Sequence, residues 1–178
     1  FYTFACMLQT DKLHLRACEP DDLPLMYQWE NNADYWLLSD TTKPFSNYTI
    51  AEFIKQDQND IFTTKQQRFV IELRNPVKPI GFIDLYQFEP VHRRAGVGIL
   101  IADLSEQKKG YAAQSLECLK NYSQTVLNMH QLYCYIQASN KKSLSLFQKA
   151  GFHKCGILKD WLINNKTPED VLMFQIIF

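Results

Sequence analysis

Residues 95–102 form the apolar run AGVGILIA, which constrains the fold of this chain more than any other segment. A strand with one face in water alternates apolar and polar residues, and this run does not, so both of its faces must be covered. A short polar stretch containing Gly110 follows, and residues 112–126 then place apolar side chains at helical spacing. The segment therefore predicts a buried strand that leads directly into a long amphipathic helix.

Strand and helix patterns alternate along the rest of the chain. The acidic Glu19, Asp21 and Asp22 begin a first helix. Thr49 caps a second helix, with Glu52 at its capping-box position, and Asn140 caps a short helix that Gly151 ends. Period-two or β-rich segments predict strands at residues 12–16, 68–74, 80–86, 132–136, 156–163 and 171–178. This order predicts one α+β domain over residues 1–178, with a mixed central sheet of about seven strands flanked by about four helices.

Composition excludes several classes of function. The net charge is zero, whereas a general nucleic-acid binder carries a basic excess, so we expect no nucleic-acid partner. No apolar run approaches the length of a membrane span, and the histidines and five cysteines lack zinc spacing, so we expect no membrane and no metal. Scattered, unpaired cysteines favour buried free thiols in the cytoplasm. Residues 1–10 lack a basic leader and are interpreted as an extension.

The junction between the apolar strand and the long helix has the character of an anion site. The first-turn amides of a helix have no partner inside it and lie at the positive end of its dipole. Gly110 allows a ligand to approach the backbone closely, and Ala112 adds little bulk. The segment suits a pyrophosphate, but an ordinary strand–helix connection with two solvated lysines explains the same residues.

Two motifs resolve this ambiguity. Residues 107–112 read QKKGYA, which matches the pattern Q/R-x-x-G-x-G/A, and residues 140–152 resemble N-x-x-S-x-x-x-Y-x-K-x-G-F. Both motifs are typical of the GNAT acetyltransferases, and their separation and their positions on the expected elements also resemble that family. The resemblance covers residues 12–178. It implies acetyl-coenzyme A as co-substrate, an amine as acceptor, and a homo-oligomer.

The resemblance also implies which residues bind the cofactor. Backbone groups of the buried strand would pair with the pantetheine arm, the QKKGYA loop would hold the pyrophosphate, and the second motif would contact the arm again. The residues at these positions are Leu100, Ile101, Ala102, Gln107, Lys108, Lys109, Gly110, Tyr111, Ala112, Asn140, Ser143 and Phe147. Asn140 is equally well explained as a helix cap.

Within the family, the chain resembles the spermidine acetyltransferases at residues 21–23, 29–32, 68–72 and 91–95. Residues 98–101 look equally like the enzymes that acetylate ribosomal-protein N-termini. A polyamine acceptor predicts an acidic pocket, assembled from residues such as Glu30, Asp34, Asp40 and Asp84. A protein N-terminus would instead require an open groove. The leading hypothesis is therefore transfer to a small polyamine, with N-terminal acetylation as the alternative.

Two departures from the family pattern affect catalysis. Phe147 replaces the tyrosine that protonates the leaving thiolate, and Gly96 replaces a glutamate common in relatives. These changes keep a third hypothesis open, in which the chain binds acyl-coenzyme A and transfers nothing.

Other residues could supply the missing acid and base. Asp84 and Glu72 are candidates for a base that acts through water, and Tyr86 and Tyr111 are candidates for the proton donor. Each also has a structural explanation, since the carboxylates could face solvent and the tyrosines could pack in the core. Direct attack with solvent-assisted proton transfer is a further possibility.

Overall fold

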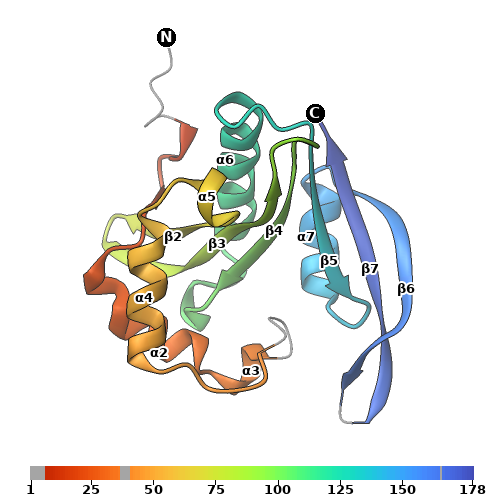
Figure 1. The fold of residues 1–178 in the computed structure, drawn as a ribbon, viewed down its shortest axis with the longest axis horizontal. Coiled ribbons are helices and arrows are strands. Elements are labelled where there is room, and N and C mark those ends of the chain that lie inside the picture. Colours follow the sequence, from red (N-terminus) through yellow and green to blue (C-terminus); the bar gives the residue numbers. More distant parts are fainter. Residues whose placement is uncertain (1–6, 37–40, 165) are drawn as a thin grey trace.

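The computed structural model describes residues 7–36, 41–164 and 166–178. Within these residues, seven strands form one sheet in the order β1-β2-β3-β4-β5-β7-β6, of which Figure 1 labels β2 to β7. In the described part of the chain, only the β4–β5 pair is parallel and the other five pairs are antiparallel, which confirms the expected mixed sheet. The strands are β1 (Leu13–Arg16), β2 (Gln67–Arg74), β3 (Val77–Glu89), β4 (Arg94–Ile101), β5 (Gln131–Gln137), β6 (His153–Asn164) and β7 (Thr167–Ile177).

Helices occupy both faces of this sheet. The described residues contain α2 (Leu23–Glu30), α3 (Ala33–Trp36), α4 (Asn47–Asp57), α5 (Ile61–Thr64), α6 (Tyr111–Thr125) and α7 (Lys141–Lys149), with 3-10 turns at Pro20–Asp22 and Leu104–Glu106. The four expected helices correspond to α2, α4, α6 and α7. The sequence did not indicate α3 and α5, which are single turns too short to show a period.

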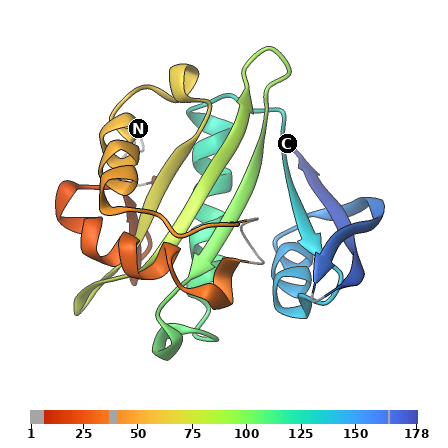
Figure 2. The same ribbon diagram turned by 60° about the horizontal axis from the view of Figure 1, so that its bottom comes forward.

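Two apolar cores form because strand side chains alternate between the faces of the sheet. Figures 1 and 2 show α6 on one side of β2–β4 and α2 and α4 on the other. The larger core lies on the α6 and α7 side and includes Ile83, Leu116 and Phe147. The smaller core lies under α2 and α4 and includes Trp29 and Phe82, whose rings meet edge to face.

The caps of the helices test the sequence interpretation directly. Asn140 caps α7 as expected, since its Oδ1 accepts a hydrogen bond from the Ser143 amide at 3.1 Å. The assignment of Thr49 as a cap, with Glu52 in the capping box, was wrong. Helix α4 begins earlier, and the Ser46 hydroxyl accepts from the Thr49 amide at 3.0 Å, which places Thr49 at the third helical position.

The strands β4 and β5 separate soon after they begin, and this divergence positions the site. They pair only where residues 94–96 lie beside residues 131–133. Strand β5 pairs along its whole length with β7 instead, so it follows that strand away from β4 (Figure 1). From Val97 onward, the edge of β4 that faces β5 therefore has no strand partner among the described residues.

Among the described residues, none of the helices combines the length and apolar character needed to cross a lipid bilayer. Cys18, Cys118 and Cys134 are buried free thiols, as expected, whereas Cys155 is exposed. Cys6 lies outside the described residues.

Candidate active site

Only every second residue of β4 directs its backbone amide and carbonyl to the open edge. This corrects the expectation that the backbone groups of Leu100 and Ala102 pair with the pantetheine arm. The Ala102 amide donates to the Ile80 carbonyl at 2.8 Å, and its carbonyl accepts from the Tyr35 hydroxyl at 3.1 Å. The Leu100 carbonyl also faces β3, since an ideal Cβ at Gly81 would lie 1.9 Å from it. Both residues therefore direct these backbone groups away from the gap between β4 and β5.

Ile101 takes the opposite direction and faces the gap, and its contact with pantetheine stays a prediction. Its carbonyl already accepts a hydrogen bond from Gln107 Nε2 at 2.9 Å, which ties the following loop to the end of the strand. Because the backbone of a strand alternates direction, Ile99 points the same way as Ile101. Sequence reasoning missed Ile99, although the alternation of backbone direction along a strand places it on the same edge as Ile101.

The loop that follows exposes a row of free amides. Within the described chain, the backbone amides of residues 108–113 donate to no backbone carbonyl. The first hydrogen bond of α6 runs from the Gln114 amide to the Gly110 carbonyl at 3.2 Å. Gly110 has a φ of 85°, and no atom lies within 4 Å of an ideal Cβ there. Exposed amides at a helix N-terminus, with open space in front of them, fit a pyrophosphate.

The two loop lysines differ in their surroundings. Lys109 Nζ lies 2.8 Å from Glu106, whereas Lys108 is exposed and has no acidic partner in the described residues. Lys78 approaches the same loop from β3, with its Nζ 2.6 Å from Asp103. Hydrogen bonds from Lys78 and Ser105 lower the pKa of Asp103 to about 2, so this carboxylate stays ionised. Sequence reasoning missed Lys78, because only the fold brings residue 78 to residue 103.

The second motif is placed beside the core. The Asn140 side chain is engaged as the cap of α7, so its contact with pantetheine stays a prediction, as does that of Ser143. Phe147 is only 3% exposed, and its ring meets Phe152 edge to face at 5.0 Å. In this position Phe147 is a core residue, and it offers no proton donor.

Two of the expected acidic residues converge on one arginine. Arg68 Nε lies 2.7 Å from Asp84 Oδ1 and its Nη2 lies 3.1 Å from Oδ2, while Nη1 donates to Glu30. Burial alone would lower the pKa of Arg68, but the charges of Asp84 and Glu30 raise it above its ordinary value. Asp34 is exposed and is not brought to this cluster, and Asp40 lies outside the described residues.

Asp84 lies at the point where β4 and β5 diverge, because it pairs in register with Gly98. A cavity of about 120 Å³ opens here, lined by Phe53, Gln66, Gln67, Arg68, Asp84, Leu85 and Tyr86. The site thus combines a cavity that contains Asp84 and Arg68 with an open strand edge, and a loop of free amides follows the end of that strand.

Glu72 is not brought to this cavity. It lies on β2, two strands from β4, and its Oε1 accepts from Arg16 Nε at 2.8 Å while Oε2 lies 3.2 Å from His14. Arg16 also binds both oxygens of Asp22. Burial raises the pKa of Asp22, but the hydrogen bonds from Arg16 and the Glu19 amide lower it more, so Asp22 is ionised. These contacts give Glu72 a structural role.

We expect Glu72→Gln to keep kcat within about twofold while lowering the free energy of unfolding by about 1–2 kcal/mol. The reason is that the amide retains the shape of the side chain but loses the charge-assisted bonds to Arg16 and His14. Chemical denaturation and steady-state kinetics measure the two effects. Glu52→Gln, which breaks an exposed pair with Lys55, is the control and should cost under about 0.5 kcal/mol. A large loss of kcat at an unchanged free energy of unfolding would instead support Glu72 as the catalytic base.

The two candidate proton donors lie on different faces of the sheet. Tyr111 is the first residue of α6 and packs against the larger core. Tyr86 lines the cavity with Asp84, on the side of α2 and α4. The structure therefore brings Tyr86, and not Tyr111, together with the acidic cluster.

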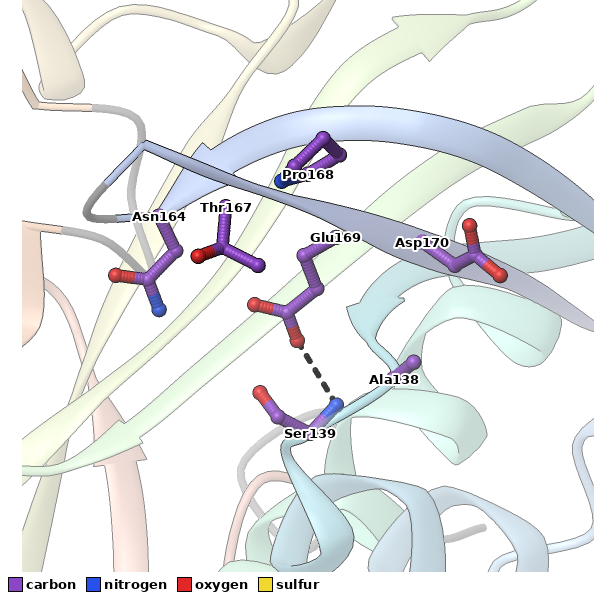
Figure 3. A pocket seen from close by; sticks show the side chains of 7 residues that line it. All are labelled: Ala138, Ser139, Asn164, Thr167, Pro168, Glu169 and Asp170. Atoms are coloured by element: carbon purple, nitrogen blue, oxygen red, sulfur yellow. Dashed lines mark hydrogen bonds between the residues drawn. The ribbon is translucent and has the colours of Figure 1, made fainter.

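A second cavity, of about 660 Å³, opens on the β7 side of β5. Figure 3 shows Glu169 and Asp170 on β7, with Glu169 accepting a hydrogen bond from the Ser139 amide at 2.9 Å. Asp170 is paired with Lys159 at 2.7 Å. The residues that line this second cavity come from the end of β5 and the β6–β7 hairpin, so the cavity is separate from the gap between β4 and β5.

Comparison with known proteins agrees with this geometry. The family described as the acetyltransferase (GNAT) domain matches residues 12–153. Spermidine N(1)-acetyltransferases of Vibrio cholerae and Escherichia coli are each 29% identical to this chain, covering 93% and 94% of it and 93% and 87% of their own lengths. A crystal structure of the Vibrio cholerae enzyme with CoA and spermine superimposes with a TM-score of 0.85, at 28% identity over 94% of this chain and 96% of that one. A dodecameric structure of the Vibrio cholerae enzyme gives a TM-score of 0.78, at 29% identity over 94% and 95% of the two chains.

Proposed function

Because the chain belongs to the GNAT acetyltransferase family, we propose that it transfers the acetyl group of acetyl-CoA to a primary amine of a small polyamine such as spermidine. The observation that carries this proposal is the pair of carboxylates, Glu30 and Asp84, beside the point where β4 and β5 diverge. Two carboxylates around one guanidinium leave a net negative charge, which favours a cationic acceptor.

The relatives support the same acceptor class. The similar enzymes of Vibrio cholerae and Escherichia coli act on spermidine, and a solved structure of the former contains CoA and spermine. The aligned regions cover more than nine tenths of this chain, and the family match over residues 12–153 includes both the loop and Asp84.

The residues divide the work of binding. The free amides of residues 108–113 suit the pyrophosphate, with Lys108 as an additional cation. Ile99 and Ile101 offer the strand edge to the pantetheine arm. Asp84, together with Glu30, attracts the charged amine to the cavity.

An amine with a pKa near 10 must lose a proton before it attacks, which costs about 4–5 kcal/mol at neutral pH without help. Asp84 is engaged with Arg68, so we assign it to holding the charge of the acceptor. Water in the cavity carries the proton to solvent.

The test measures release of CoA from acetyl-CoA with four kinds of acceptor. These are spermidine, spermine, monoamines whose chain carries no further charge, and peptides that begin with Ser or Ala. We expect turnover with the polyamines, and Asp84→Asn should raise KM for spermidine about tenfold because one carboxylate charge is lost. Asp34→Asn removes an exposed carboxylate and serves as the matched control. Preference for the peptides would favour N-terminal acetylation. Binding of acetyl-CoA without any transfer would favour the acyl-CoA-binding hypothesis that Phe147 keeps open.

We also propose that the protein is a homo-oligomer in the cytoplasm. The similar Vibrio cholerae enzyme forms a dodecamer, and β6 of this chain carries exposed Trp161 and Ile163. Apolar side chains in solvent on an edge strand favour contact with another protein surface. Light scattering during size-exclusion chromatography measures the subunit count.

A further inference from the structure

Tyr86 occupies the space that a side chain at position 96 would need. The two residues pair in register across β3 and β4. An ideal Cβ at Gly96 would lie 2.3, 2.4 and 2.8 Å from three ring carbons of Tyr86. At Gly98 the same construction meets Tyr86 Cε1 and Asp84 Oδ2, each at 3.9 Å. The ring of Tyr86 therefore lies across β4 from Gly96 to Gly98, beside the Asp84 carboxylate.

This position is the start of the gap between the strands. The pairing of β4 with β5 ends where Gly96 meets Tyr133, and Tyr86 covers β4 from that residue onward. From β5, the Tyr133 ring meets the Tyr86 ring edge to face, with centroids 6.2 Å apart. The Tyr133 hydroxyl is engaged, because it donates to Gln87 Oε1 at 2.8 Å.

The hydroxyl of Tyr86 is available for a ligand. Within the part of the chain that the structure describes, this hydroxyl has no hydrogen-bond partner. Burial raises the pKa of Tyr86, as do the nearby Cys134, Tyr133, Tyr135 and Asp84, so the phenol is protonated at neutral pH. A protonated phenol beside the reaction site can donate a hydrogen bond or a proton.

We propose that Tyr86 is a catalytic residue that donates its phenolic proton to the sulfur of CoA as the thiolate leaves. This inference rests on the proposed acetyl transfer. The amine nitrogen forms a bond to the thioester carbonyl carbon, the carbon–sulfur bond breaks, and the sulfur takes the Tyr86 proton. The attacking nitrogen carries two protons and the amide keeps only one. The Tyr86 phenolate recovers its proton from this nitrogen. Tyr86 thus supplies the proton donor that Phe147 lacks.

Tyr86→Phe tests the hydroxyl alone, because the phenylalanine ring keeps the packing over Gly96. We expect kcat to fall about 30-fold, somewhat less than is typical for loss of a general acid, since a thiolate is a good leaving group. KM for acetyl-CoA should change by less than about threefold. The matched control is Tyr133→Phe, which removes a hydroxyl that is bound to Gln87, and its kcat should stay within about twofold of wild type.

A second measurement does not depend on turnover. The pKa of the CoA thiol in the binary complex is read from thiolate absorbance during a pH titration. A hydrogen bond from Tyr86 favours the thiolate, so the Tyr86→Phe complex should show a thiol pKa that is higher by about one. Equal thiol pKa values in the two proteins, or equal kcat values, would overturn the proposal. If wild type lowered the thiol pKa but transferred acetyl to no amine, the contact with sulfur would stand and the proposed function would fail.

Discussion

Replacing Arg68 with alanine is expected to lower the free energy of unfolding by about 3 kcal/mol. The Arg68 side chain is only 18% exposed and holds Asp84 and Glu30, whose side chains are 25% and 21% exposed. Removing the cation leaves two carboxylates facing each other with little water, and breaking such a pair is far more costly than losing a surface pair. The guanidinium also lies 4.8–5.0 Å from the ring centroids of Phe82 and Phe53, and these contacts are lost too.

Urea denaturation of wild type and Arg68→Ala at neutral pH measures this loss. The control is Arg94→Ala, which breaks a pair with Glu89 in which both side chains are more than 40% exposed, and it should cost under about 1 kcal/mol. A loss at Arg68 as small as that of the control would show that the cluster is solvated and that the cavity is not an acidic enclosure.

The cluster also shows where prediction from sequence ends. The apolar run at residues 95–102 predicted a buried strand, because continuous hydrophobicity depends only on local composition. Its partner strands and the seven-stranded sheet followed in the same way. That Arg68 binds both Glu30 and Asp84 could not be predicted, because these residues are 38 and 16 positions away and meet only when β2, β3 and α2 are assembled.

Strand direction explains the errors at the cofactor edge. The sequence did not indicate which backbone groups of residues 100–102 face β3. One hydrogen bond, from the Ala102 amide to the Ile80 carbonyl, fixes which residues of β4 face β3. As a result, Ile99 and not Leu100 directs its backbone groups to the gap between β4 and β5. Glu72 and Asp84 looked alike in sequence, since each is a carboxylate within an apolar strand. They differ because β1 supplies Arg16 and His14 to Glu72, whereas Asp84 borders β4.

Gly110→Asp is expected to weaken acetyl-CoA binding about 100-fold, whereas Gly110→Asn should weaken it about threefold. Aspartate and asparagine have nearly the same shape, and both tolerate the left-handed backbone that Gly110 adopts with a φ of 85°. An ideal Cβ meets nothing within 4 Å, so either side chain fits the free protein. The difference between the variants is one negative charge beside the amides of residues 108–113, where the pyrophosphate is expected.

Stability should change in the opposite direction from binding. Gly110 is the N-cap of α6, and a negative charge at a helix N-terminus is favourable. Without ligand, the aspartate variant should therefore be as stable as the asparagine variant, or more stable by about 0.5 kcal/mol. Thermal unfolding of the free proteins and calorimetric titration with acetyl-CoA separate the two effects, because a general disturbance of the loop would lower both quantities together.

The salt dependence of binding gives a further distinction. Repulsion between aspartate and pyrophosphate acts through solvent-exposed space and is screened, so the ratio of the two dissociation constants should shrink as ionic strength rises. A steric effect of the side chain would leave that ratio unchanged. Equal affinity of the aspartate and asparagine variants at low salt would mean that the pyrophosphate lies elsewhere. The free amides of α6 would then be an ordinary helix N-terminus, which is the alternative that residues 99–113 left open.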